Sequence, residues 1–341
     1  MKRIASCWAV LLLCAASPFA LAANTWTVTS TGSGGNCTAN SSAAGCTLDA
    51  AINAAGDGDL IHFSAAVQGQ TISGVYLRND FGSLTIDGSP GGMILDGGGN
   101  GPFLALNSGN ITLSHMTFQH ATANAIYNTG ATMTIDSCAF LNNSTSSPSD
   151  ANGGAVVQVA GSVFIVNSTF VGNSASGNGG AINAYGNVVI SNSTITANHA
   201  GSNGGGIGGY GFTIMSSIVA GNTAANNPDI YGFGGQASLG YNIIGNSSGS
   251  GLAATTGDQF GIDPLFVAAG LANNGGATQT VALQSSSPAR SGGNCAGNAS
   301  GPTIPAITLD QIDHTRTSAG AIGCTVGAFD MTSIFHDGFG N

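Results

Sequence analysis

The chain has 341 residues, a formal net charge of −10 and only 6% charged residues. Glutamate is absent and Lys2 is the sole lysine, and because Glu and Lys cover exposed helices, this composition argues against a helical protein. The negative charge disfavours nucleic acid and anionic membranes as partners, because the chain can neutralise few phosphates. A hydrophobic content of 42% excludes general disorder. We therefore expect a folded protein of strands and tight turns.

The N-terminal segment 1–22 is typical of a secretory signal peptide. Lys2 and Arg3 precede an apolar run that ends in a small-x-small triplet at 20–22. Cys14 raises lipidation as an alternative, but the residue before it is not the small one that a lipidation signal needs. Cleavage after Ala22 removes Lys2 and Arg3, so the mature chain is more acidic than the full chain. We expect an exported protein, either secreted or held at the outer cell surface.

Strand-and-turn segments repeat through the middle of the chain. One apolar position recurs at Leu113, Ile135, Ile165, Ile190 and Ile214. Two more apolar rows follow, at Phe118, Phe140, Phe170, Ile195 and Val219, and at Ile126, Val156, Ile182 and Ile207. A period of this length is typical of a solenoid, and short β-branched segments between Gly/Asn turns indicate strands. The sequence predicts an all-β, right-handed parallel β-helix with coils stacked about 4.8 Å apart.

The expected organisation follows the chain in order. It consists of a signal peptide (1–22), an N-terminal cap with the first coils (23–80), the β-helix repeats (81–245), a disulfide-stapled C-terminal region (246–330) and a tail (331–341). Residues 47–55 show the one amphipathic helical pattern, with Thr47 as N-cap. We expect this short helix to cap the open N-terminal end of the solenoid, because an exposed sheet edge would pair with other chains.

A polar row accompanies the apolar ones. It consists of Asn143, Asn173, Asn198 and Asn222. Stacked amides can satisfy one another and the bent backbone at a corner, so this row predicts a structural side-chain ladder.

Five cysteines remain after the expected cleavage, and in an exported protein we expect them to pair. Cys37 with Cys46 would close a short loop, and Cys295 with Cys324 would staple the C-terminal region. Cys138 is left over. Met or Ser occupies its position in the other repeats, which predicts a small buried side chain and no reactive thiol.

Motifs near both ends of the repeats resemble a known family. CTLDAAINAAGDGDLIHF (46–63) resembles the Cys-Ser-Leu-Arg-Glu-Ala-Ile motif of exported bacterial β-helix proteins, with Asp-Ala in place of Arg-Glu. The C-terminal region is similar to the choice-of-anchor Q domain in LGYNIIG (239–245), DPLF (263–266), NNGGATQTVALQSSSPA (273–289), DQIDHTR (310–316) and GCTVGAFD (323–330). The family form of DQIDHTR is Asp-Gln-Arg-Gly-x-x-Arg, from which Ile312 and Asp313 depart while Arg316 matches. The resemblance implies a pectin-lyase-like fold and export, and no particular activity.

The predicted fold raises polysaccharide-cleaving enzymes as a function class. Pectate-lyase chemistry needs acidic calcium ligands and an Arg or Lys base, but only Arg78 lies near the coils, and polygalacturonase motifs are absent. Asp87 and Asp136 align on an outward row, two coils or about 9–10 Å apart, near the upper spacing of an inverting glycosidase pair. They are the candidate catalytic residues. The alternative for this row is an ordinary solvated face.

Cofactor and metal sites leave little trace in the sequence. We expect no cofactor and no dedicated metal site, because the histidines lack metal-ligand spacing and DGGGNG (96–101) lacks the calcium-binding nonapeptide pattern. Scattered aspartates keep weak Ca²⁺ binding open. Arg290 and Arg316 are expected to pair with Asp310 or Asp313 rather than to bind substrate.

Tyr185 and Tyr210 repeat in register one coil apart. They indicate a repetitive ligand-binding strip, and the alternative is a pair of stacked core aromatics. We expect a non-enzymatic exported protein that binds a polysaccharide or cell-surface polymer, as an adhesin or matrix component would. The alternative is a polysaccharide lyase or glycoside hydrolase. IFHDGFGN (334–341) is similar to short C-terminal tails of exported bacterial proteins.

Overall fold

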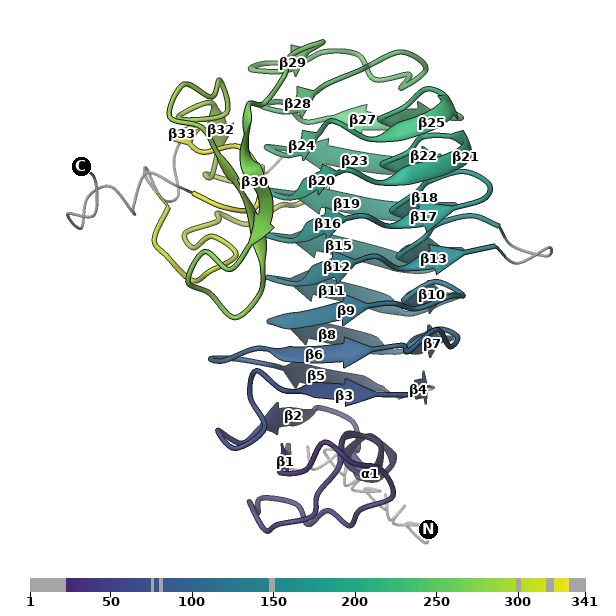
Figure 1. Ribbon diagram of the computed structural model, residues 1–341, viewed down its shortest axis with the longest axis vertical. Coiled ribbons are helices and arrows are strands. Elements are labelled where there is room, and N and C mark those ends of the chain that lie inside the picture. Colours follow the sequence, from purple (N-terminus) through teal and green to yellow (C-terminus); the bar gives the residue numbers. More distant parts are fainter. Residues whose placement is uncertain are drawn as a thin grey trace, which may run out of the picture.

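The computed structural model describes residues 23–74, 77–79, 82–146, 151–298, 302–316 and 322–330. Through most of these residues the chain winds as a right-handed parallel β-helix, with its coils stacked along one axis (Figure 1). The fold expected from the repeats is therefore confirmed. The expected signal peptide and the tail lie outside the described residues.

Three long parallel sheets form the walls of the solenoid. Sheet A contains β1 (Thr25–Val28), β2 (Asp59–Phe63), β5 (Ser83–Asp87), β8 (Asn110–Ser114), β11 (Thr132–Asp136), β15 (Ser162–Val166), β19 (Asn187–Ser191), β23 (Phe212–Met215) and β27 (Ala237–Ser238). Sheet B contains β3 (Thr71–Ser73), β6 (Met93–Asp96), β9 (Met116–Gln119), β12 (Ala139–Leu141), β16 (Thr169–Val171), β20 (Thr194–Thr196), β24 (Ile218–Val219), β28 (Ile243–Ile244) and β29 (Gln259–Phe260). Sheet C contains β4 (Leu77–Asn79), β7 (Leu104–Leu106), β10 (Ile126–Asn128), β14 (Val156–Gln158), β18 (Ile182–Ala184), β22 (Ile207–Gly209) and β26 (Ile230–Gly232). A short fourth sheet, D, joins β13 (Ser144–Thr145), β17 (Ser174–Ala175), β21 (His199–Asn203) and β25 (Thr223–Asn226).

Inward-facing side chains stack in columns along the axis. Ile135 pairs in register with Leu113 on one side and Ile165 on the other, as the sequence alignment predicts. Phe140 stacks on Phe118 with ring centroids 4.9 Å apart. Because a coil cannot bury its apolar side chains alone, each coil completes the core of its neighbours.

The asparagine row forms a buried ladder of hydrogen bonds between sheets B and D. The Nδ2 of Asn143 donates to Oδ1 of Asn173, that of Asn173 to Asn198, and that of Asn198 to Asn222, at 2.9–3.0 Å. Their backbone N–H groups donate to the same oxygens. The ladder ends on a carboxylate, because both the backbone N–H and Nδ2 of Asn222 donate to Oδ1 of Asp229.

The short helix lies at the N-terminal end of the solenoid, as expected (Figure 1). It is α1 (Leu48–Ala54), and its inner face is buried. Thr47 occupies the N-cap position, but its hydroxyl makes no capping hydrogen bond to the helix and instead accepts one from the backbone N–H of Gly35. The Cys37–Cys46 disulfide closes the loop in front of the helix.

After the last coil the chain returns along the side of the solenoid (Figure 1). We call residues 262–298, 302–316 and 322–330 the strap. It contains two antiparallel pairs, β30 (Phe266–Ala272) with β31 (Thr280–Leu283), and β32 (Gly293–Asn294) with β33 (Ile322–Cys324). Parallel stacking of coils continues past residue 245, since β29 pairs in parallel with β28.

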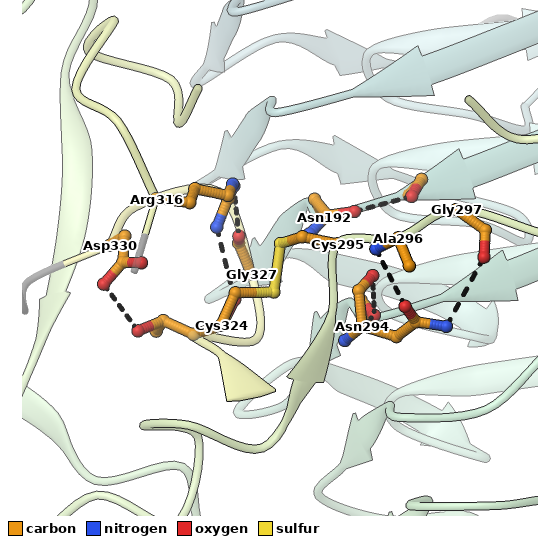
Figure 2. Close-up of a disulfide and its surroundings, with 12 residues drawn as sticks. Asn192, Asn294, Cys295, Ala296, Gly297, Arg316, Cys324, Gly327 and Asp330 are labelled. Carbon is orange, nitrogen blue, oxygen red and sulfur yellow. Dashed lines mark hydrogen bonds between the residues drawn. A yellow bond between two sulfur atoms is a disulfide. The ribbon is translucent and has the colours of Figure 1, made fainter. Parts of the chain in front are cut away.

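The strap packs on the corner between sheets A and B. The Cys295–Cys324 disulfide staples it internally, next to the place where it meets Asn192 (Figure 2). Two disulfides fit an oxidising compartment. Cys138 is buried and lies outside both disulfides. In the part of the chain that the structure describes, no helix has the length and apolarity to cross a membrane.

Candidate functional site

One outward column of side chains follows the corner where sheet C turns into sheet A. The backbone N–H of Tyr185 donates to Gln158 O, that of Tyr210 to Ala184 O and that of Phe233 to Gly209 O. These three residues, and Val159 before them, therefore occupy the same position in four successive coils. We call Val159, Tyr185, Tyr210 and Phe233 the aromatic column.

The aromatic column presents apolar surface to solvent. Val159, Tyr210 and Phe233 are 37%, 45% and 51% exposed, and they are three of the five large exposed hydrophobic residues in the described part of the chain. The rings of Tyr185 and Tyr210 lie 5.8 Å apart at 60°. Exposure on this scale excludes a core role for Tyr210. Contiguous exposed apolar patches of this kind mark interaction surfaces.

A second amide ladder runs beside the aromatic column, and the sequence analysis missed it. Asn203 donates to Oδ1 of Asn178, and Asn227 donates to Oδ1 of Asn203. At the other end, the backbone N–H of Asn178 donates to Oδ1 of Asn152, whose Nδ2 donates to the Tyr185 hydroxyl at 2.8 Å. We call Asn152, Asn178, Asn203 and Asn227 the outer amide ladder. Unlike the buried ladder, all four residues are partly exposed.

The outer amide ladder had a signal in the sequence, the recurring triplet Asn-Gly-Gly. The first glycine of each triplet takes a left-handed conformation, with φ of 68° at Gly179 and 63° at Gly204. A Cβ at Gly179 would clash with the Ile182 carbonyl oxygen, so only glycine fits this turn. One repeated string, NGGAINAYG and then NGGGIGGYG, thus encodes the ladder, the turn, a core isoleucine and the exposed tyrosine.

The acidic row lies on the outward face of sheet A. Asp87 and Asp136 both pair in register with Ser114, so they are two coils apart as aligned. The Asp87 carboxylate accepts hydrogen bonds from Ser89, Ser114 and His115. Burial would raise the pKa of Asp87, but these hydrogen bonds outweigh it and hold the pKa far below its usual range. Asp87 is therefore ionised at neutral pH, and its oxygens are occupied by local donors.

His115 bridges the solenoid to the strap. Its Nδ1 lies 2.9 Å from Oδ1 of Asp87, and its Nε2 lies 3.1 Å from Oδ1 of Asp313. Burial would lower the pKa of His115, but the hydrogen bonds and charges of the two aspartates raise it to about 9. We call Asp87, His115 and Asp313 the clasp. Sequence reasoning did not connect Asp313 to His115, which lies 198 residues away in the chain.

Asp136 has a different environment from Asp87. It lines a pocket of about 620 Å³ between sheet A and the strap. Burial raises the pKa of Asp136, against hydrogen bonds from Ser137 and Asn167 that lower it. The remaining lining residues are Thr134, Phe164, Val166 and Asn167 from the solenoid and Thr303, Pro305, Ala306, Ile307, Thr308 and Leu309 from the strap.

The DQIDHTR segment anchors the strap. Arg316 is 1% exposed, and its guanidinium donates to strap carbonyls and to Oδ1 of Asn167 (Figure 2 shows the bond to Gly327). Burial lowers the pKa of Arg316 to about 10, while Asp310 and Asp330 raise it through their charges. The expected pairing of Arg316 is thus a through-space attraction to Asp310, whereas Asp313 faces His115.

Within the described residues, no group of three or more His, Cys or Asp side chains is arranged to hold a metal ion. His62, His120 and His199 each contact one local partner, respectively Thr27, Asp96 and Thr223.

Comparison with known proteins adds neither a family nor a function. No family model matches the chain, and no curated protein or solved structure is significantly similar to it. The assignment of function therefore rests on the fold and on the geometry of the aromatic column, the clasp and the pocket.

Proposed function

We propose that this protein is an exported, non-enzymatic β-helix protein that binds an extended, uncharged polysaccharide along the aromatic column. The single observation that carries the proposal is the exposure of Tyr210 and Phe233 at one repeated position of successive coils. A polymer with a short repeat is the natural ligand of a surface that itself repeats every coil.

The chemistry of the column and its flank suits a sugar chain. Pyranose rings have apolar C–H faces that stack on exposed Tyr and Phe rings, whose rigidity keeps the entropic cost of binding low. The outer amide ladder beside the column offers Asn groups that both donate and accept hydrogen bonds, as sugar hydroxyls do. The net charge of the chain disfavours acidic polymers, and the stacking and hydrogen-bonding groups of this surface carry no charge, so the proposed ligand is a neutral glycan.

Export and family membership belong to the same proposal. The N-terminal segment 1–22 has the pattern of a cleaved signal peptide, and the two disulfides are consistent with secretion. Membership of the choice-of-anchor Q group is supported by the motif positions Asp310, Gln311 and Arg316. All three side chains are buried in the strap, where a substitution would disturb the fold, so a family with this fold would conserve them.

Retention of the purified mature protein on a panel of insoluble and gel-embedded polysaccharides tests the binding function. We expect one neutral polymer to retain the wild type, and Tyr210→Ala/Phe233→Ala to weaken retention at least tenfold, because each stacked ring contributes about 1 kcal/mol. The matched control is Ile262→Ala/Leu309→Ala, which removes two side chains of similar exposure, 38% and 42%, elsewhere. Equal loss in both variants would mean non-specific hydrophobic adsorption and would refute the proposal.

A polysaccharide lyase or glycoside hydrolase is the second candidate function, favoured by one observation. Asp136 is a carboxyl group of raised pKa in a pocket, which is how a general acid is prepared. The same panel, scored for new reducing ends and unsaturated products, with and without Ca²⁺, tests it. Turnover lost in Asp136→Asn or Asp87→Asn would identify the acidic row as an active site and overturn the non-enzymatic function.

A further inference from the structure

The pocket beneath the strap is a second site with its own chemistry, toward the opposite end of the sheet A strands from the aromatic column. Its volume of about 620 Å³ is typical of small-molecule sites. Apolar groups form most of its lining, with Phe164 and Val166 on sheet A facing Pro305, Ile307 and Leu309 of the strap. Asp136 is the one ionisable residue in that lining.

The cations near Asp136 already have other partners. His115 on the neighbouring coil lies between the carboxylates of Asp87 and Asp313. Arg316, approaching from the strap, uses its guanidinium on backbone carbonyls and on Asn167. Asp136 itself receives hydrogen bonds from the neutral side chains of Ser137 and Asn167, and the charges of His115 and Arg316 act on it only through space.

Carboxyl groups outnumber the cations around Asp136. Asp87 and Asp313 flank His115, and Asp310 and Asp330 act through their charges on Arg316. An anionic ligand would therefore be repelled, and a cationic group at Asp136 would supply the missing positive charge. The ring of Phe164 adds an aromatic wall of the kind that attracts ammonium groups.

We propose that the pocket binds a small organic cation, an ammonium group on an apolar body, with Asp136 as its counter-ion. The ammonium group forms charge-assisted hydrogen bonds with the Asp136 carboxylate, and the apolar body fills the space between Phe164 and the strap residues 305–309. This site is independent of polysaccharide binding at the aromatic column, so either proposal can fail while the other stands.

Titration of the full mature protein with benzylammonium, followed by amide chemical shifts, tests the proposal. We expect benzylammonium to bind at least about tenfold more tightly than benzyl alcohol, which has the same apolar body and no charge. Benzoate should not bind. The amide shifts should be largest at Thr134, Asn167 and the strap residues 306–309.

Asp136→Asn provides the decisive variant, because it keeps the side-chain shape and removes the charge. In this variant benzylammonium should bind no more tightly than benzyl alcohol. The control is Asp57→Asn, which changes an exposed aspartate near the N-terminal end of the solenoid and should leave the affinity for benzylammonium unchanged. The affinity of the wild type should also fall as acid protonates Asp136. Equal affinities for the amine and the alcohol, or an unchanged affinity in a folded Asp136→Asn protein, would overturn the proposal.

Discussion

Asp313 shows how one residue can connect two distant parts of the chain. Its φ of 63° is in the left-handed region. Aspartate tolerates this conformation better than most residues, so the turn can form without a glycine. The turn places the Asp313 carboxylate against His115 and so completes the clasp.

The clasp should make stability depend on pH. The folded pKa of His115, about 9, lies above its unfolded value of about 6.5, so its contribution is complete below pH 6.5 and is lost as the pH rises through 9. The pKa of Asp87 is lowered, so its contribution is present above pH 4 and is lost in acid. We therefore expect His115→Gln to lower the melting temperature at pH 6 and to have little effect above pH 9.

Differential scanning calorimetry of wild type and His115→Gln between pH 5 and 10 measures this dependence. His199→Gln is the matched control, because His199 is exposed and its ring bonds a neutral hydroxyl, that of Thr223. A difference between wild type and His115→Gln that stays constant over this pH range would contradict the clasp.

At the scale of single elements, the buried asparagine ladder stabilises the corner between sheets B and D. Asn173 and Asn198 each accept two bonds from the coil before and donate to the coil after, so both satisfy groups on two neighbouring coils. Asn198 is 1% exposed, which leaves no room for water to replace its bonds. The repeated asparagines therefore form one continuous, buried network of hydrogen bonds.

Asn198→Ala should lower the free energy of unfolding by about 3 kcal/mol or more, because the donors of Asn173 and the carbonyl of Phe170 lose their partner in a buried site. Asn187→Ala is the control. Asn187 is exposed and bonds Ser162 on the surface, so its loss should change stability by less than about 0.5 kcal/mol. Denaturant unfolding of both variants measures these changes. Equal losses of unfolding free energy would mean that the buried ladder contributes no more than a surface hydrogen bond.

The whole molecule combines a solenoid with a strap, and we expect these two parts to unfold separately. Coils contact only their neighbours, so a disturbance at one end is not transmitted far. The strap instead contacts several coils, from Ser137, which accepts a bond from Thr278, to Ser216, which bonds Asn294. We infer that the strap adds long-range cohesion that the stacked coils lack.

Removal of the Cys295–Cys324 disulfide should loosen the strap and leave the N-terminal coils intact. Its sequence separation of 29 corresponds to roughly 3–4 kcal/mol of stabilisation through restriction of the unfolded chain. In Cys295→Ser/Cys324→Ser, hydrogen exchange should accelerate in the strap and stay slow in β5, β8 and β11. Cys37→Ser/Cys46→Ser should give the reverse pattern, faster near α1 only. Faster hydrogen exchange throughout the chain in both variants would show that the solenoid and the strap unfold together.

The sequence predicted the repeated parts of the structure to the residue. The rows through Ile135 and Phe140 and the buried ladder through Asn173 could be aligned because each coil pairs with the next one along the chain. Tyr185 and Tyr210 could be placed in one column for the same reason. Their exposure could not be predicted, since an outward and an inward aromatic leave the same period in a turn.

The clasp, the buried Arg316 and the pocket at Asp136 were decided by the tertiary structure. They join residues of the coils to residues of a strap that returns over the corner between sheets A and B. A strap that runs back along the coils has no period to align, so sequence spacing says nothing about which coil residue it meets. The sequence by itself therefore determined the solenoid, its core and its regular ladders, because these are contacts between repeats. Only the folded chain decided where the strap lies, which aspartate joins the clasp and which one lines a pocket, because those outcomes depend on burial and on partners that come from far along the chain.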